Sequence, residues 1–284
     1  LRLHPGSAGV LVPELPEVEN VGRALKSNLQ GRRLTRLKVD FAGVLGQSAR
    51  KTRAALVGKT LTDVHRHGKY MILWFAGDDG QPAYLMVHLR MTGQFFILDE
   101  FVPDKHVHVT FDFDGLDVHY RDIRKFGRLT LVGDGAATDE LAHIGPDMMK
   151  VRFPQWHRRI ASRTAPIKAL LLDQGIAAGL GNIYVDESLF LAGVHPEARP
   201  CDLDEDTLRD VLKRGKHVMR LAIDHGGTTF LNFTNFYGKP GNVRRKLRVY
   251  GRGGEPCRDC GSTLEKIVVA GRGTVFCPEC QGLP

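Results

Sequence analysis

The apolar positions near the start of the chain follow a helical period. Val18, Val21 and Leu25 lie three or four residues apart, which predicts a helix that ends before Gly31. That helix would carry its N-terminus, with Pro13 and the acidic residues that follow it, at one edge of a domain.

The period then changes to that of strands. Short apolar runs over 69–75 and 83–89 predict two strands, and the alternation of apolar and polar residues over 107–113 is typical of a half-buried strand. Asp114-Gly115 predicts a hairpin turn into residues 116–123. We therefore expect the first half of the chain to be a mostly antiparallel sheet domain.

The second half is predicted to be helical, with a boundary near residue 145. Apolar periodicity indicates helices over 165–177, 183–196 and 208–223, and glycines interrupt them. Residues 1–12 show no period and begin without methionine. We interpret them as an extension or tag-like tail.

Composition adds a preference for an anionic partner. The 284 residues include 40 Lys and Arg against 32 Asp and Glu, a net charge of +8 with a pI near 9.3. No apolar run reaches the length of a membrane span, and the N-terminus does not have the profile of a secretory signal. We expect a protein that acts inside the cell, in the cytoplasm, without a membrane partner. The basic residues crowd the end of the chain: Arg244, Arg245, Lys246, Arg248, Arg252, Arg258, Lys266 and Arg272.

Four cysteines near the C-terminus have the spacing of a metal site. Cys257 and Cys260 form one pair with two residues between them, and Cys277 and Cys280 form a second with the same spacing. This pattern predicts one tetrahedral zinc ion bound by four sulfurs; the alternative is a pair of disulfides, which intracellular redox conditions disfavour. Four sulfurs leave no position for water or substrate, so the zinc would be structural.

The segment "PELPEVE" offers a second candidate chemistry at Pro13, Glu14 and Lys69. A proline nitrogen at the start of a chain is a secondary amine, and its attack on a sugar carbon gives an iminium that promotes elimination of phosphate. Glu14 would carry the proton that ring opening and base departure require. The alternative is structural, because proline and acidic residues are common in the first turn of a helix.

Three motifs together resemble one family. "PELPEVE" at 13–19, "GLGNIYVDESLF" at 179–190 and "VYGRGGEPCRDCG" with "GRGTVFCPECQ" at 249–281 resemble bacterial formamidopyrimidine-DNA glycosylase, also called 8-oxoguanine DNA glycosylase. The resemblance implies an α+β multidomain fold. Its parts are an N-terminal antiparallel β-sandwich with flanking helices (13–140), a helical helix-two-turn-helix domain (146–245) and a C-terminal zinc ribbon (250–284).

The resemblance also implies the reaction. Such an enzyme excises 8-oxoguanine and formamidopyrimidines from duplex DNA and cleaves the abasic site by β- and δ-elimination through a proline Schiff base. Pro13 would be the nucleophile, Glu14 the general acid, Glu17 a supporting hydrogen-bond partner and Lys69 a lysine near the lesion and its phosphate. The family's mature chain begins at this proline, and Val12 stands where the initiator methionine belongs.

DNA-binding roles follow from the same resemblance. Met91, Arg124 and Phe126 would fill the gap that the damaged base leaves, with the arginine bonded to the orphaned cytosine. Asn182 and Arg272 would bind phosphates. The family's lesion-capping loop corresponds to residues 236–252.

Two alternatives stay open. Endonuclease VIII-type enzymes of the same fold prefer oxidised pyrimidines, and they usually have glycine where this chain has Leu15. A noncatalytic, zinc-dependent DNA-binding protein would result if residues before Pro13 persist. We expect the partner to be duplex DNA with an oxidised purine opposite cytosine, bound by a monomer. The resemblance implies a bacterial cytoplasmic protein associated with the nucleoid.

Overall fold

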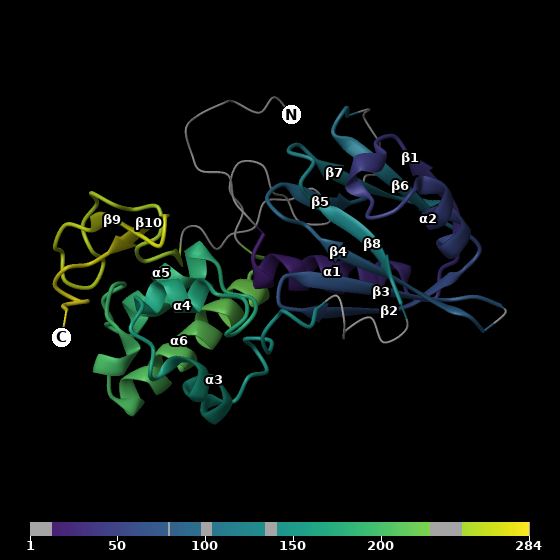
Figure 1. The fold of residues 1–284 in the computed structure, drawn as a ribbon. Helices are drawn as coiled ribbons and strands as arrows, with labels where there is room; N and C mark the ends of the chain where they lie inside the picture. Colours follow the sequence, from purple (N-terminus) through teal and green to yellow (C-terminus); the bar gives the residue numbers. More distant parts are fainter. Residues whose placement is uncertain (1–12, 79, 98–103, 134–140, 228–245, 284) are drawn as a thin grey trace. The chain divides into compact units, whose positions relative to one another are not determined.

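The protein is shown in Figure 1 as a computed structural model, which describes residues 13–78, 80–97, 104–133, 141–227 and 246–283. The chain divides into two compact units. The first comprises Leu1–Ala142 with His225–Arg244, and the second comprises His143–Asp224 with Arg245–Pro284. The predicted sandwich and the first predicted helix fall in the first unit, and the helices predicted for the second half and the four cysteines fall in the second.

Within the described residues, the first unit contains two four-stranded sheets, and every neighbouring pair of strands is antiparallel. The predicted antiparallel β-sandwich is therefore confirmed. One sheet has the order β1 (Leu34–Val39), β6 (Val107–Phe113), β7 (Leu116–Asp122), β5 (Gly93–Phe96). The other has the order β2 (Thr60–His67), β3 (Tyr70–Ala76), β4 (Pro82–His88), β8 (Arg128–Val132).

Aromatic rings form much of the sandwich core. Phe75 on β3 stacks on Phe113 on β6, with ring centroids 6.3 Å apart, and so joins one sheet to the other. Phe95 packs against Phe111 and Tyr120 at 6.1 and 5.1 Å. None of these five side chains is more than 2% exposed. Large buried aromatic surfaces of this kind contribute strongly to the stability of a core.

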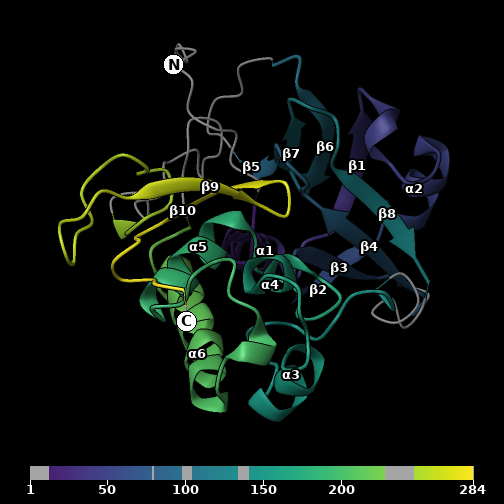
Figure 2. The same ribbon diagram turned by 60° about the vertical axis from the view of Figure 1, so that its left-hand side comes forward.

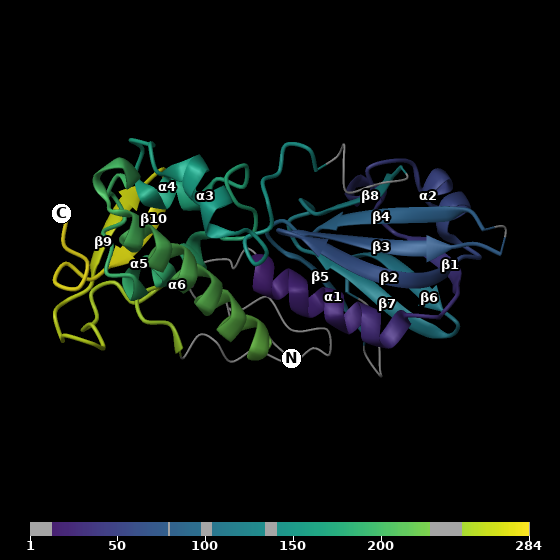
Figure 3. The same ribbon diagram turned by 90° about the horizontal axis from the view of Figure 1, so that it is seen from below.

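Helix α1 (Leu15–Leu29) lies alongside β2 and β3 (Figure 3). It confirms the predicted helix, and its apolar residues Val18 and Leu25 are buried. Gly22 lies against the sheet: a Cβ there would be in ordinary van der Waals contact, 3.6 Å from side-chain atoms of both Met71 and Val64. Between β1 and β2 the chain forms the short helices η1 (Ala42–Val44) and α2 (Ala49–Leu56).

The described part of the second unit is helical apart from one hairpin. Helix α5 is buried along nearly its whole length, and α6 packs its apolar face against it. Figure 2 shows the hairpin of β9 and β10 beside α5. Among the described residues, no helix is long and apolar enough to span a membrane. The elements are α3 (Phe153–Ile160), α4 (Ile167–Leu172), α5 (Asn182–Leu191), η2 (Pro200–Asp202), α6 (Glu205–Asp224), β9 (Glu265–Val269) and β10 (Arg272–Phe276).

The helix predicted over 165–177 is wrong in length, since α4 covers only Ile167–Leu172. Pro166 is the N-cap. At the other end Asp173 is the C-cap, and its side chain accepts a hydrogen bond from the backbone N–H of Gly175 at 2.8 Å. An aspartate that bonds the backbone two residues on favours a turn over continued helix.

Candidate active site and metal centre

Two buried carboxyl groups lie at the N-terminus of α1, directly after Pro13. The backbone N–H of Glu14 donates to Glu17 Oε2 at 2.9 Å, and the Glu14 side chain accepts a bond from the backbone N–H of Glu17. Glu14 is 2% exposed, Glu17 is 1% exposed, and Pro13 is also buried. This reciprocal capping satisfies backbone donors that a helix start leaves unpaired. The segment therefore has the structural role that the sequence allowed, which is to cap the start of the helix. The same capping contacts fix the position of Glu14, next to Pro13.

Ion pairs fix the direction of α1 along β2. Near the C-terminal end of the helix, Lys26 Nζ lies 2.7 Å from Asp63 Oδ1. Nearer its N-terminal end, Glu19 Oε2 lies 2.6 Å from Arg66 Nε. Because β2 runs from Asp63 through Arg66 toward the turn that carries Lys69, the N-terminus of α1 points to that same end of the sheet.

The turn between β2 and β3 is tied to α1 through Arg66. Gly68 has a φ of 56°, which favours glycine, and its carbonyl accepts a bond from Arg66 Nη1 at 3.0 Å. Burial raises the pKa of Glu19, but the guanidinium groups of Arg66 and Arg23 outweigh it, so the pKa is lowered overall. Glu19 thus stays ionised and holds the arginine that supports the turn with Lys69.

Two segments cross side by side from one sheet to the other. The last residue of β4 pairs with the first of β8, and the first residue of β5 pairs with the last of β7. The connecting segments, 89–92 and 123–127, are therefore neighbours, and the residue that follows Lys69 pairs with the end of β4. The segment 89–92 carries Met91, and the segment 123–127 carries Arg124 and Phe126.

The second segment presents an apolar ring to solvent. Phe126 is 48% exposed, and the Arg124 guanidinium carbon lies 4.7 Å from the centre of its ring. A phenylalanine that is part of the core would be buried, so Phe126 is not a core residue. An exposed ring beside a cation has the chemistry to stack on a base and bind an anion.

His88, which sequence reasoning missed, stands at the end of β4. Its Nδ1 accepts the backbone N–H of Arg90 at 2.9 Å, and its ring lies edge-on to Tyr70 with centroids 4.4 Å apart. Burial, with smaller contributions from Arg90 and Lys69, lowers the pKa of His88 to about 3. The imidazole is therefore neutral at physiological pH and acts as an acceptor.

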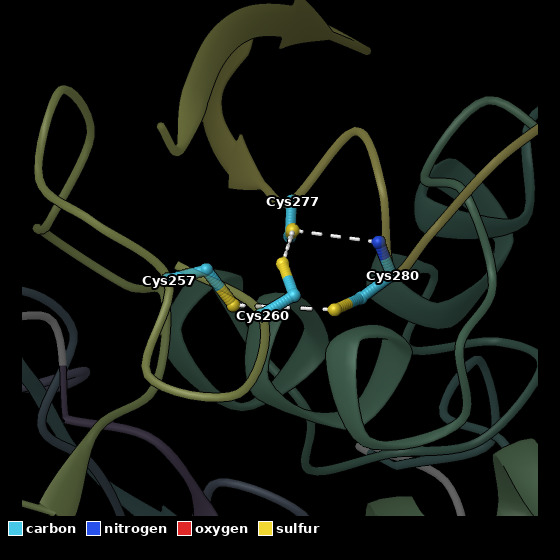
Figure 4. A group of neighbouring side chains, drawn as sticks. All are labelled: Cys257, Cys260, Cys277 and Cys280. Carbon is cyan, nitrogen blue, oxygen red and sulfur yellow. Dashed lines mark hydrogen bonds between the residues drawn. The ribbon is translucent and has the colours of Figure 1, made fainter. Parts of the chain in front are cut away.

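The four cysteines converge on one point (Figure 4). Their Sγ atoms all lie within 4.8 Å of one another, with Cys257 to Cys280 at 4.0 Å and Cys260 to Cys277 at 3.4 Å. A tetrahedral site with Zn–S bonds of about 2.3 Å separates its sulfurs by about 3.8 Å, whereas a disulfide bond is about 2.05 Å long. The cluster fits one structural zinc ion and excludes the disulfide alternative.

Helix α5 holds the hairpin that carries Arg272. Ala270 and Gly271 form its turn with φ values of 51° and 69°. The carbonyl of Gly273 accepts bonds from Asn182 Nδ2 at 2.9 Å and from Lys168 Nζ at 3.3 Å. Two predicted DNA-binding residues, Asn182 and Arg272, are thereby brought together within this unit.

A buried charge pair supports the same contact. Lys168 Nζ lies 2.6 Å from Asp186 Oδ1, and neither side chain is exposed. Burial raises the pKa of Asp186 to about 7 although Lys168 opposes it. The neighbouring Glu187 accepts the backbone N–H groups of residues 248, 249 and 250 at 2.7, 2.9 and 2.8 Å. The sequence contained a signal for these buried acids: Asp186 and Glu187 are adjacent acidic residues inside an otherwise apolar helix.

The predicted site residues thus form two groups. At one end of the first unit lie Pro13, Glu14, Glu17, Lys69, Met91, Arg124 and Phe126, and in the second unit lie Asn182, Arg272 and the four cysteines. The part of the predicted capping loop at 236–245 lies outside the described residues.

Family models match three consecutive regions of the chain. They are the formamidopyrimidine-DNA glycosylase N-terminal domain at residues 12–129, its H2TH domain at 144–234, and the zinc finger found in FPG and IleRS at 254–282. The order and content of these regions define a zinc-finger protein of the helix-two-turn-helix DNA glycosylase class.

Whole proteins agree with the regional matches. The formamidopyrimidine-DNA glycosylase of Latilactobacillus sakei is 40% identical over 95% of this chain and 98% of its own length, and that of Bacillus subtilis is 38% identical over 95% and 99%. The crystal structure of Lactococcus lactis Fpg with DNA containing N7-benzyl-Fapy-dG aligns with a TM-score of 0.88 at 34% identity over 95% and 100%. The chain belongs to the formamidopyrimidine-DNA glycosylase family.

Loss of one zinc ligand is expected to unfold the ribbon. Cys277 is fully buried, and the small cluster around it includes Val249, Val275 and Phe190 of α5. We predict that Cys277→Ser abolishes zinc binding and that amide exchange in β9 and β10 becomes fast, because so small a module depends on its metal. Cys201→Ser, at an exposed cysteine outside the cluster, is the control and should keep one zinc per chain. Stoichiometric zinc in Cys277→Ser would contradict the assignment.

Replacing Glu19 tests the pair that supports the Lys69 turn. A carboxyl whose pKa falls below its usual 4.5 on folding stabilises the protein above that value, and the stabilisation disappears as the pH falls through the lowered pKa. We expect Glu19→Gln to reduce the free energy of unfolding by about 1–3 kcal/mol at about pH 7. The difference from wild type should be smaller at a second, acidic pH below the usual 4.5, where the stabilisation is lost as the lowered pKa is approached.

Urea unfolding at both pH values measures this difference. The control is Glu205→Gln, which removes an exposed ion pair with Arg209 and should change stability little. An equal loss for Glu19→Gln at both pH values would show that the ionised carboxylate is not the cause.

Proposed function

We propose that the protein is a base-excision repair glycosylase that removes oxidised purines from duplex DNA and then cleaves the strand at the abasic site. The observation that carries the proposal is the convergence of three features at one end of the sandwich. They are the buried carboxyl pair beside Pro13, the turn with Lys69, and the crossing segments with Met91 and Phe126. Membership of the formamidopyrimidine-DNA glycosylase family supports the same substrate class.

Pro13 acts as the nucleophile in this proposal. The reaction requires the nitrogen of Pro13 to be a chain-terminal secondary amine, since a peptide nitrogen is not nucleophilic. The amine attacks C1′, the bond from C1′ to the damaged base breaks, and the base leaves with a proton. Cleavage of the C1′–O4′ bond, with protonation of O4′, then gives an iminium. The iminium withdraws electrons from C2′, which loses a proton as the 3′ phosphate leaves, and loss of a proton from C4′ then expels the 5′ phosphate.

Glu14 supplies the proton that opens the sugar ring. Its burial and the capping contact with Glu17 hold the carboxyl next to the nucleophile, so that little reorganisation is needed. Lys69 contributes a positive charge close to the phosphate of the lesion. His88 stays neutral and does not compete for protons near physiological pH.

The crossing segments keep the damaged base out of the stack. Phe126 wedges between base pairs, Met91 occupies the space that the base leaves, and Arg124 bonds the orphaned cytosine. The half-exposed ring of Phe126 with the guanidinium above it supports these roles. A partner cytosine is thus part of the proposed substrate, and a single chain carries the whole site.

The second unit binds the phosphate backbone. Asn182 and Arg272 are held by the Gly273 carbonyl contact, and the net charge of +8 favours a polyanion. The zinc ion, bound by four sulfurs, would hold the ribbon and take no part in the reaction.

Borohydride trapping tests the nucleophile. Protein that begins at Pro13 should form a reducible covalent adduct with 8-oxoguanine duplex DNA, and protein that retains residues 1–12 should form none. Glu14→Gln should bind the damaged duplex but excise the base about 100- to 10,000-fold more slowly, as expected for loss of a general acid. Glu205→Gln serves as the matched control at an exposed glutamate and should leave excision unchanged.

Full excision by protein that retains residues 1–12 would remove Pro13 from the mechanism. Unchanged turnover in Glu14→Gln would remove Glu14 alone. Excision of dihydrouracil in preference to 8-oxoguanine would instead assign the protein to the oxidised-pyrimidine enzymes.

A further inference from the structure

Asp122, the last residue of β7, is a fully buried carboxylate with no part in the reaction described above. A carboxylate is almost never fully buried unless donors replace its lost hydration. The donors around Asp122 therefore indicate what it is for.

The carboxylate bonds both ends of the segment that carries Phe126. Asp122 Oδ2 accepts the backbone N–H of Gly127 at 2.7 Å, and Oδ1 accepts the backbone N–H of Arg124 at 3.2 Å. One side chain thereby closes the segment 123–127 into a fixed loop. Phe126 projects from it with half of its surface exposed.

Thr92 links this loop to the neighbouring one. Its hydroxyl donates to Asp122 Oδ1 and accepts the backbone N–H of Arg124 at 3.0 Å. Thr92 is 7% exposed and directly follows Met91. The two segments that carry the proposed gap-filling residues are therefore joined by one hydroxyl and one carboxylate.

Further contacts leave the loop little freedom. A Cβ on Gly127 would lie 1.8 Å from the Tyr120 hydroxyl, so no other residue fits there. Lys125 has a φ of 58°, and its ammonium lies 4.3 Å from the centre of the Phe41 ring. The loop is built in one conformation before any ligand arrives.

We propose that Asp122 and Thr92 are positioning residues that hold Phe126, Arg124 and Met91 in the arrangement that enters the DNA stack. This inference rests on the proposed function. Preorganising three side chains removes the cost of ordering two loops upon binding, and it sets how far they penetrate together. Asp122 and Thr92 themselves do not touch the DNA.

The test separates stack insertion from Schiff-base chemistry. The zinc-loaded protein, in the form that gives the borohydride adduct, is mixed with a duplex that contains 8-oxoguanine opposite cytosine and 2-aminopurine next to the lesion. The fluorescence of 2-aminopurine increases when the wedge unstacks it. The second substrate is a single strand with a preformed abasic site, which has no partner base and no closed stack.

Asp122→Asn keeps the shape of the side chain but has only one acceptor oxygen, so either Gly127 or the other two donors lose their partner. We expect the rate of the fluorescence rise and of excision to fall about 10- to 100-fold, as expected for loss of charged hydrogen bonds. Trapping on the abasic single strand should stay within about threefold of wild type. Thr92→Val should show a smaller effect of the same kind, and Thr92→Ser, which keeps the hydroxyl, should restore insertion.

The control is Asp112→Asn, at the hairpin that precedes β7. Asp112 also accepts a backbone N–H, that of Gly115 at 2.9 Å, but at the opposite end of β7. It should leave fluorescence and excision as in wild type.

Each outcome decides one point. If wild type excises no base, the proposed function is wrong. If wild type excises and Asp122→Asn inserts and excises equally well, only the positioning role is wrong. If Asp122→Asn loses single-strand trapping in parallel with excision, the residue supports the fold in general, and the positioning role is overturned.

Discussion

A carboxylate removed from water is stable only where hydrogen-bond donors or cations replace its hydration, and this protein uses that constraint repeatedly. Glu17 accepts the backbone N–H of the residue beside Pro13, Asp122 accepts those of its loop, and Glu187 accepts three from residues 248–250. In the first two cases the segment that is held carries a proposed functional residue, and in the third it leads into the zinc ribbon. The buried acid makes one conformation of that segment strongly preferred, because any other leaves a charge without partners.

The same constraint joins the zinc ribbon to the helices beside it. Asp186 accepts the backbone N–H of Val275 on β10 and is paired with the buried Lys168, which in turn bonds Gly273. Phe190 of α5 completes the apolar cluster of the ribbon. The metal therefore organises only part of this module. Its orientation relative to Asn182 depends on charges in α4 and α5 that have no role in zinc binding.

Sequence patterns predicted the features of the fold that depend on residues close together in the chain. The period of α1, the alternation in β6 and the spacing of the four cysteines each depend on residues near in sequence, and each prediction is confirmed. The predicted length of α4 is wrong because the side chain of Asp173 bonds the backbone two residues on and ends the helix there. The roles of Pro13 and Glu14 rest on the chemistry of their side chains and on the resemblance, and those of the DNA-binding residues rest on the resemblance; all of them stay predictions.

The link between the two positioning residues could not be predicted, because Thr92 is distant in sequence from both of its partners, Asp122 and Arg124. Thr92 and Asp122 are 30 residues apart, and Glu187 and its partners are separated by 61 to 63. An aspartate at the end of a strand and a threonine after a methionine are common, and nothing in their own neighbourhoods marks them. Only the antiparallel register, which places β5 beside β7 and β4 beside β8, makes them neighbours.

His88 lies close to two positive charges, those of Lys69 and Arg90, but does not itself become charged at physiological pH. Burial is the main reason that its pKa falls to about 3, and Lys69 and Arg90 add to the effect. Phosphates that approach these cations would cancel their smaller contributions, whereas burial would persist. Burial alone therefore favours a neutral imidazole. It continues to accept the backbone N–H of Arg90, so the segment that leads to Met91 keeps its shape over the physiological pH range.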